Sequence, residues 1–181
     1  SDLSLGIKKA ILVVGGGAAG MEAALNAACQ GVEVHLIEKT GELGGVAKQL
    51  NATWKGEKIQ DYLNDLIARI KDHSGLTLYM NTEVNSFTGS MGNFITTLKN
   101  NDTGEKVTIE HGAAILATGG KEYKPDEYLY GKHSDVLTHL DMDAALREDD
   151  ERIKKAKSLV FIQCVGSRND KNPYCSKVCC T

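Results

Sequence analysis

The feature that most constrains the fold of this chain is a short apolar run that leads directly into a cluster of glycines. Residues 10–14 read Ala-Ile-Leu-Val-Val, a run typical of a buried parallel strand, and residues 15–20 read Gly-Gly-Gly-Ala-Ala-Gly. The alanine-rich sequence that follows predicts a helix that packs closely against a strand, and Gly31 is placed to end it. Residues 32–37 predict a second strand, with Glu38 at its end. The order strand, glycine turn, helix, strand, acid predicts a parallel α/β sheet.

Each glycine of the first turn has a separate role in binding a dinucleotide. Gly15 permits the tight turn, Gly17 lets the backbone approach a pyrophosphate, and Gly20 allows the helix and the strand to pack closely. The pyrophosphate is expected at the N-terminus of the helix, and Glu38 is expected to hold a pair of ribose hydroxyls. Because an acid at this position disfavours a 2′-phosphate, NADP is disfavoured as the ligand, which leaves FAD and NAD.

Two later glycine turns favour FAD over NAD. Residues 39–45 form a loop that ends in a glycine pair, where backbone can approach a second part of the same ligand. Residues 113–120 read Ala-Ala-Ile-Leu-Ala-Thr-Gly-Gly, which predicts a buried strand that ends in another glycine turn. Both turns resemble FAD-contacting motifs of the flavoprotein disulfide reductases. Between them, the segment from Glu83 to Glu110 contains three strand-like pieces, which predicts an inserted antiparallel meander.

A second signal lies near the end of the sequence, where residues 163–180 hold four of the five cysteines. Their spacing is C-x10-C-x3-C-C, at Cys164, Cys175, Cys179 and Cys180. The apolar run 159–162 predicts a strand that places the first sulfur at its end and the other three on the following loop. Four thiolates suit an iron–sulfur cluster or a structural zinc ion, and the two adjacent cysteines favour the larger cluster. A disulfide between those neighbours would be strained, although such a pair could act in redox catalysis.

Together these motifs resemble the A subunit of heterodisulfide reductase, and the cysteine segment is the specific part of the resemblance. Residues 128–131, Tyr-Leu-Tyr-Gly, also contribute to it. In that family the subunit is an iron–sulfur flavoprotein whose FAD passes electrons between iron–sulfur centres, and in some complexes it splits an electron pair between acceptors. The resemblance implies a 4Fe-4S cluster on the four clustered cysteines. It also implies an FAD site formed by Gly15, Gly17, Ala18, Ala19, Gly20, Glu38, Lys39, Gly44, Gly45, Val84, Ala117, Thr118 and Gly119.

The predicted architecture is α/β: a Rossmann-like FAD-binding domain of the flavoprotein disulfide reductase type with an inserted meander, plus the start of a second domain. We expect the FAD-binding fold over residues 1–120, with the meander at about 82–110. Residues 121–157 read as a connector and one helix, and 158–181 as an incomplete second domain that carries the cysteines. Family members are much longer, so we expect a truncated fragment that is not active by itself. The second domain lacks a G-x-G-x-x-G motif, which argues against nicotinamide binding there.

Composition bounds the class of protein and its partners. The chain has 181 residues, 41% hydrophobic and 25% charged, with a net charge of −3, which is ordinary for a globular protein. It has no block of like charge that would indicate nucleic-acid binding, and no apolar stretch of membrane length. We therefore expect a cytoplasmic location. In that reducing compartment, cysteines indicate ligand or redox chemistry more than a disulfide scaffold. The expected partners are other electron-transfer subunits or the missing remainder of the chain.

The predicted function is that of an electron-transfer oxidoreductase component that uses FAD and a 4Fe-4S cluster. One alternative is an FAD-dependent dithiol oxidoreductase that uses Cys179 with Cys180, or Cys175 with Cys179, and needs no iron. Another is a non-catalytic nucleotide-binding or zinc-stabilised scaffold. The three interpretations differ in whether iron, reversible thiols or neither is found.

Several other residues are interpreted as structural. The segment 58–72 predicts an amphipathic surface helix. Cys29 is expected to be a buried thiol, and His35 and His73 are expected to have structural roles. Trp54 and Lys48 follow the second glycine turn, and the sequence assigns them no role.

Overall fold

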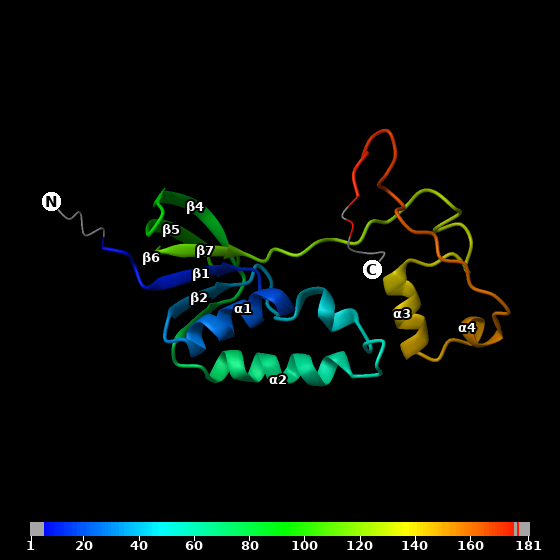
Figure 1. Cartoon of the computed structure of the whole chain (residues 1–181), viewed down its shortest axis with the longest axis horizontal. Coiled ribbons are helices and arrows are strands. Elements are labelled where there is room, and N and C mark those ends of the chain that lie inside the picture. Colours follow the sequence, from blue (N-terminus) through cyan, green and yellow to red (C-terminus); the bar gives the residue numbers. More distant parts are fainter. Residues whose placement is uncertain (1–5, 176, 178–181) are drawn as a thin grey trace. The chain divides into compact units, whose positions relative to one another are not determined.

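The computed structural model describes residues 6–175 and residue 177. The chain divides into two compact units, the first ending at Gly119 and the second beginning at Gly120. Figure 1 labels the helices and strands of each unit. Within the described residues, no helix is both long enough and apolar enough to cross a membrane.

The core of the first unit is a four-stranded parallel sheet with the order β3-β2-β1-β7. Its strands are β1 (Ala10–Val14), β2 (Glu33–Ile37), β3 (Leu76–Tyr79) and β7 (Ala113–Leu116). Two helices cover one face of the sheet, α1 (Ala18–Cys29) and α2 (Ile59–Asp72) (Figure 1). Side chains alternate along β1, so Val13 packs toward the helices with Met21 of α1 and Leu66 of α2.

An antiparallel sheet packs on the other face. It consists of β4 (Thr82–Ser90), β5 (Asn93–Asn100) and β6 (Lys106–His111), in the order β4-β5-β6. Leu12 and Ile37 of the parallel sheet form one buried cluster with Leu98 and Ile109 of the meander. The parallel sheet is therefore the middle layer of three.

A buried histidine links the meander to β7. His111 is fully buried, and its Nε2 lies 2.8 Å from Oγ1 of Thr96 in β5. Its Nδ1 lies 2.8 Å from the carbonyl oxygen of Ala113 in β7. A carbonyl oxygen only accepts, so Nδ1 carries a proton and donates to it, and Nε2 shares a hydrogen bond with the Thr96 hydroxyl, which can donate or accept. Both ring nitrogens are thereby satisfied inside the core.

The second unit contains two short helices, α3 (His139–Arg147) and α4 (Glu151–Lys155). Thr138 and Asp141 form a reciprocal capping box at the start of α3. The Tyr130 hydroxyl donates to Oδ2 of Asp141 at 3.1 Å, and Lys124 Nζ lies 3.7 Å from Oδ1 of the same carboxylate. Hydrogen bonds and charge thus hold the segment before α3 against its first turn.

The predicted fold class is confirmed in both layers of strands. Three of the parallel strands, the helix after the first glycine turn, the amphipathic helix and the three-stranded meander occur where the sequence indicates them, whereas β3 was not predicted. One expectation about the last parallel strand is wrong, because Leu116 of β7 is 77% exposed. Since β7 is an edge strand of the described sheet, its outer side lacks the neighbour that would bury it.

Two expectations for the second unit are also wrong. Residues 159–162 do not form a strand, and Val160 is 85% exposed, because no described strand pairs with this segment. The single helix expected before residue 157 is instead two helices. Asp149 has a left-handed φ of 61°, which ends α3, and the Asp150 side chain then caps α4 through the Arg152 N–H.

Candidate functional site

The first glycine turn lies at the carboxyl end of β1, and two of its glycines are required by close backbone contacts. A Cβ atom on Gly15 would lie 2.2 Å from the carbonyl oxygen of Ala117, and one on Gly20 would lie 1.8 Å from the carbonyl oxygen of Gly15. Gly15 also has a φ of 112°, which a residue with a side chain rarely adopts. Any larger residue at Gly15 would push β1 away from the end of β7, and any larger residue at Gly20 would push α1 away from β1.

Gly17 differs, because a Cβ there would meet nothing within 4 Å. Gly17 is the N-cap of α1 with a φ of −74°, and no side chain caps the helix. Ala18 and Ala19 form its first turn, and Ala19 is exposed. An uncapped helix N-terminus with small residues presents backbone N–H groups and a partial positive charge, the features that suit an anionic phosphate.

Glu38 places a carboxylate beside the same turn. The residue is only 8% exposed, and its Oε2 accepts a 2.8 Å hydrogen bond from the Gly16 N–H. Its Oε1 accepts from the N–H and the hydroxyl of Thr40, at 2.8 and 2.9 Å. An ionised carboxylate has about four acceptor sites, so these three bonds fix its orientation and leave capacity for a further donor. Sequence reasoning missed Thr40, whose only signal is its position two residues after the acid.

The second glycine turn lies directly on the first. The Gly44 N–H donates to the Gly16 carbonyl at 2.8 Å, and Gly17 and Gly44 form a parallel bridge. A Cβ on Gly45 would lie 3.2 Å from the Cα of Gly17. Gly45 also begins a short 3-10 helix, η1 (Gly45–Gln49). Backbone from two distant parts of the sequence therefore meets beside the N-terminus of α1.

The third turn joins the site through β7. The Ala117 N–H donates to the Val14 carbonyl at 2.8 Å, and a Cβ on Gly15 would lie 3.3 Å from the Cα of Thr118. Gly119 follows with a φ of 68°. The structure thus brings together most of the residues predicted for the cofactor: Gly15, Gly17, Ala18, Gly20, Glu38, Gly44, Gly45, Ala117 and Thr118.

The other predicted cofactor residues lie next to these contacts. Exposed Lys39 directly follows Glu38, and its carbonyl accepts from the Asn101 amide at 3.4 Å. Val84 lies in β4 opposite Leu98, two residues after Thr82, whose N–H donates to the Glu38 carbonyl at 2.9 Å.

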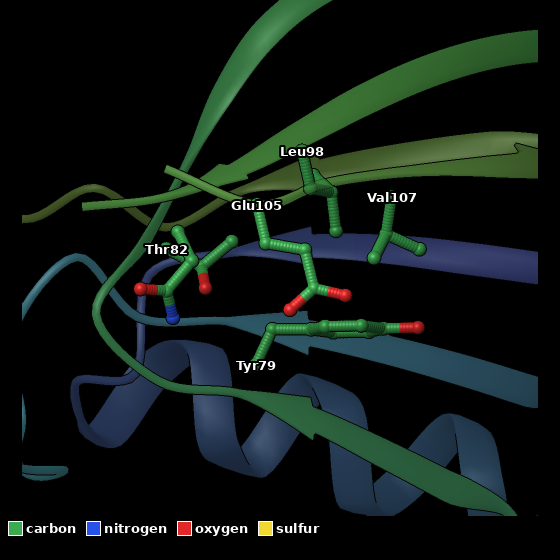
Figure 2. Close-up of a pocket in the computed structure, with 6 residues that line it drawn as sticks. Tyr79, Thr82, Leu98, Glu105 and Val107 are labelled. Atoms are coloured by element: carbon green, nitrogen blue, oxygen red, sulfur yellow. The ribbon is translucent and has the colours of Figure 1, made fainter. Parts of the chain in front are cut away.

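A separate hollow lies between β3 and the meander and does not belong to the glycine turns. Its volume is about 100 Å³, and it is lined by Tyr79, Thr82, Leu98, Asn100, Glu105 and Val107. Figure 2 shows the Glu105 carboxylate beside the Tyr79 ring. Pockets for nucleotide-sized ligands are several times larger, so this hollow is not a candidate for the cofactor.

The predicted cluster cysteines lie in the second unit, and only two of them are among the described residues. Cys164 and Cys175 are half-buried free thiols. Cys164 starts a turn closed by the Ser167 N–H on its carbonyl at 3.0 Å, and the Lys177 N–H donates to the Cys175 sulfur at 3.3 Å. Cys179 and Cys180 lie outside the described residues. Within residues 6–175 and 177, no three His, Cys, Asp or Glu side chains are grouped to hold a metal ion.

The expectation that Cys29 is a buried thiol is wrong, because the residue is exposed. It is the last residue of α1, where the helix face no longer packs, and its sulfur lies 3.9 Å from Nε2 of His73. The other ring nitrogen of His73 accepts from the Gly75 N–H at 3.1 Å. Buried His35 hydrogen-bonds the Tyr79 hydroxyl at 3.3 Å, and its pKa is lowered, chiefly by burial. These contacts fit structural roles for both histidines.

The chain is similar to one family of oxidoreductases over most of its length. Residues 9–162 match the family model of the pyridine nucleotide-disulphide oxidoreductases. The A subunit of the ferredoxin/F420H2-dependent CoB-CoM heterodisulfide reductase of Methanosarcina acetivorans is 25% identical over 260 residues, covering 94% of this chain and 33% of that protein. One of the iron-sulfur A subunits of the CoB-CoM heterodisulfide reductase of Methanopyrus kandleri is 23% identical, covering 96% of this chain and 40% of that protein. The resemblance to these A subunits is confirmed along almost the whole chain.

A crystal structure shares the fold of part of this chain. The L-proline dehydrogenase of P. horikoshii matches 62% of this chain and 22% of its own, with a TM-score of 0.53 and 23% identity. The chain spans between a third and two fifths of the length of the two heterodisulfide reductase relatives. The aligned region with the Methanosarcina acetivorans protein is longer than the 181 residues of this chain, so that relative carries residues within it that this chain lacks.

Proposed function

Because the chain belongs to the pyridine nucleotide-disulphide oxidoreductase family, we propose that it is the FAD-binding part of an electron-transfer protein similar to the A subunit of heterodisulfide reductase. One observation carries the proposal: three glycine turns, an uncapped helix N-terminus and a buried carboxylate meet at the carboxyl ends of β1, β2 and β7. Ligands of open α/β sheets bind at this edge.

The residues present fit an FAD molecule. Gly17 leaves the space in front of the α1 N-terminus free of side-chain atoms, which suits the pyrophosphate. The Glu38 carboxylate has remaining acceptor capacity for the ribose hydroxyls. A Cβ on Gly45 would lie 3.2 Å from the Cα of Gly17, so glycine at position 45 lets a second stretch of backbone lie beside Gly17, where it could also approach the phosphates. When bound, FAD supplies a centre that exchanges electrons in pairs or singly.

We further propose that Cys164, Cys175, Cys179 and Cys180 ligate a 4Fe-4S cluster. Two observations support this. The Methanopyrus kandleri relative is named as an iron-sulfur protein, and the described cysteines are free thiols on turns of the second unit. Four thiolates are the standard ligand set of such a cluster. Cytoplasmic location, and other electron-transfer subunits as partners, belong to the same proposal.

The proposal is tested by anaerobic reconstitution of the chain with FAD, iron and sulfide. We expect about one FAD and about four irons per chain after gel filtration, with visible absorption that bleaches on reduction with dithionite. FAD bound without iron, together with thiols that oxidise reversibly, would instead support the FAD-dependent dithiol oxidoreductase. A chain that retains no FAD would contradict both functions.

Two variants, Gly17→Ala and Gly6→Ala, test the location of the FAD site. In Gly17→Ala the new methyl group has room in the folded chain but occupies the space of the pyrophosphate, so FAD affinity should fall at least about tenfold. Its free energy of unfolding should stay close to that of the wild type. Gly6→Ala is the matched control, because Gly6 also has nothing within 4 Å of a Cβ and lies outside the site. Equal FAD affinity in Gly17→Ala and Gly6→Ala would place the pyrophosphate elsewhere.

A further inference from the structure

The single tryptophan of the chain is exposed on a loop that is firmly held. Trp54 is 90% exposed, the same fraction as Met91 at a hairpin turn. A tryptophan side chain contributes strongly to stability or binding when a partner covers it, and here the described residues leave it uncovered. Most of its surface is therefore available to a ligand.

The loop that carries Trp54 is a closed hairpin. The Thr53 N–H donates to the Glu57 carbonyl at 2.9 Å, and the Gly56 N–H donates to the Thr53 carbonyl at 2.9 Å. The Thr53 hydroxyl donates to the Glu57 carboxylate at 3.0 Å, and an antiparallel bridge joins Ala52 to Lys58. Trp54 thus sits on a turn with a defined backbone.

This hairpin is joined to the glycine turns. Gln60, in the first turn of α2, donates its side-chain amide to the carbonyls of Ala47 and Leu50 at 3.1 and 2.9 Å, which fixes η1 against α2. η1 begins at Gly45, directly after Gly44, which forms a parallel bridge with Gly17. Figure 1 shows η1 and the start of α2 at the end of the first unit where α1 begins. The segment 45–60 is therefore a continuous, hydrogen-bonded extension of the proposed pyrophosphate site.

The direction of the bound dinucleotide follows from Glu38. Its carboxylate lies at the end of β2 and suits the ribose of the adenosine half. The segment 45–60, which continues from Gly45, can then contact the other half of the ligand, the half that carries the flavin. A flavin ring is flat, aromatic and broad enough to cover an indole, and stacked aromatic rings attract beyond their area of contact. Lys55 adds a positive charge, with its Nζ 5.2 Å from the centre of the Trp54 ring.

We propose that Trp54 stacks on the isoalloxazine ring of FAD and positions it at this end of the first unit. The inference rests on the proposed function, because it needs FAD to bind. Trp54 is a positioning residue for the cofactor, and the 52–58 hairpin is the structure that holds it. No other tryptophan is present in the sequence, so indole signals report on this position alone.

The test compares the wild type with Trp54→Phe and Trp54→Ala by flavin and tryptophan fluorescence. An indole in contact with a flavin quenches flavin emission, so the lifetime of bound FAD should be short in the wild type and clearly longer in Trp54→Phe. The dissociation constant for FAD should rise about fivefold in Trp54→Ala. FAD should also shield Trp54 from acrylamide, whereas ADP, which occupies only the adenosine and pyrophosphate positions, should not. Tyr123→Phe, an exposed aromatic residue of the second unit, is the matched control.

The outcomes separate the two proposals. If FAD binds but its lifetime is the same in Trp54→Phe as in the wild type, the stacking proposal is overturned and the proposed function stands. If ADP shields Trp54 as well as FAD does, the indole contacts the adenosine half and the stacking proposal is likewise overturned. If no FAD binds to the wild type, both proposals fail.

Discussion

Gly17 and Gly20 belong to one motif, but the fold requires glycine only at position 20. Gly17 faces open space, so its lack of a side chain matters only to the proposed ligand. Gly20 faces the carbonyl oxygen of Gly15, so its lack of a side chain matters to the fold. The same residue type thus serves the proposed binding of FAD at one position and packing three residues later.

This difference predicts that Gly20→Ala destabilises the first unit. Its Cβ would lie 1.8 Å from a backbone oxygen, which cannot move without displacing β1 or α1. Overpacking of this kind costs about 1–3 kcal/mol and sometimes more. Urea unfolding followed by circular dichroism measures the change, with Gly17→Ala as the control that should unfold like the wild type. A Gly20→Ala variant as stable as Gly17→Ala would contradict the close contact.

At the scale of single residues, the sequence predicts positions that belong to a known motif. It misses positions whose environment depends on where a helix ends or on how a loop folds. The positions around Gly15 follow from a turn whose geometry is shared by many proteins. Cys29 has the same helical spacing as buried alanines, yet it is exposed because α1 ends there. Thr40 contacts Glu38 through a loop conformation that no local pattern specifies.

At the scale of elements, α3 depends on carboxylates that are ionised in the folded state. Burial acts to raise the pKa of Asp141, but hydrogen bonds from Thr138 and Tyr130 and the charge of Lys124 outweigh it, so the pKa lies below its usual 3.8. The pKa of Glu122 is also lowered, since hydrogen bonds from Lys124 and Thr138 outweigh its burial.

These shifts predict that the second unit loses stability in acid. A carboxylate whose folded-state pKa lies below its unfolded value stabilises the fold fully above the unfolded pKa, and this contribution is lost as pH falls through the folded value. The loss attributable to Asp141 should therefore occur below about pH 4. Helical circular dichroism from pH 7 to pH 2 measures it.

Asp141→Asn should lower helicity at pH 7 and reduce the acid-dependent loss, while Asp170→Asn, on an exposed bend, should behave like the wild type. An Asp141→Asn variant with the acid transition of the wild type would refute this role.

A strand could be predicted from the sequence where an apolar run also has neighbouring strands that pair with it. The run at residues 10–14 forms a strand because β2 and β7 pair with its two sides. The run at residues 159–162 is equally apolar, yet no described strand pairs with it and it stays irregular. Strand formation needs a partner that composition does not specify. The break between α3 and α4 likewise depends on a left-handed Asp149, which helical periodicity does not reveal.

At the scale of the whole molecule, the two proposed redox sites lie in different units. Every residue proposed for FAD precedes Gly120, and all four cysteines proposed for the cluster follow it. The sequence suggests both sets through spacing motifs, three glycine turns for FAD and the cysteine spacing for the cluster, and both sets remain predictions. The geometry of the proposed cluster does not follow from spacing in the same way, because four proposed ligands spread over 17 residues converge only if the loop between them folds.

This separation predicts that each cofactor can be removed without the other. Cys164→Ser replaces one thiolate ligand by a weaker oxygen donor, so iron retained after anaerobic reconstitution and desalting should fall from about four per chain to well below one. The FAD content and the dissociation constant for FAD should stay unchanged, because Cys164 lies in the second unit and the glycine turns lie in the first. Cys29→Ser is the matched control, since that thiol is exposed in the first unit and should affect neither cofactor. Loss of FAD together with iron in Cys164→Ser would show that the two sites are coupled, and loss of iron in Cys29→Ser would show that the cluster ligands are assigned wrongly.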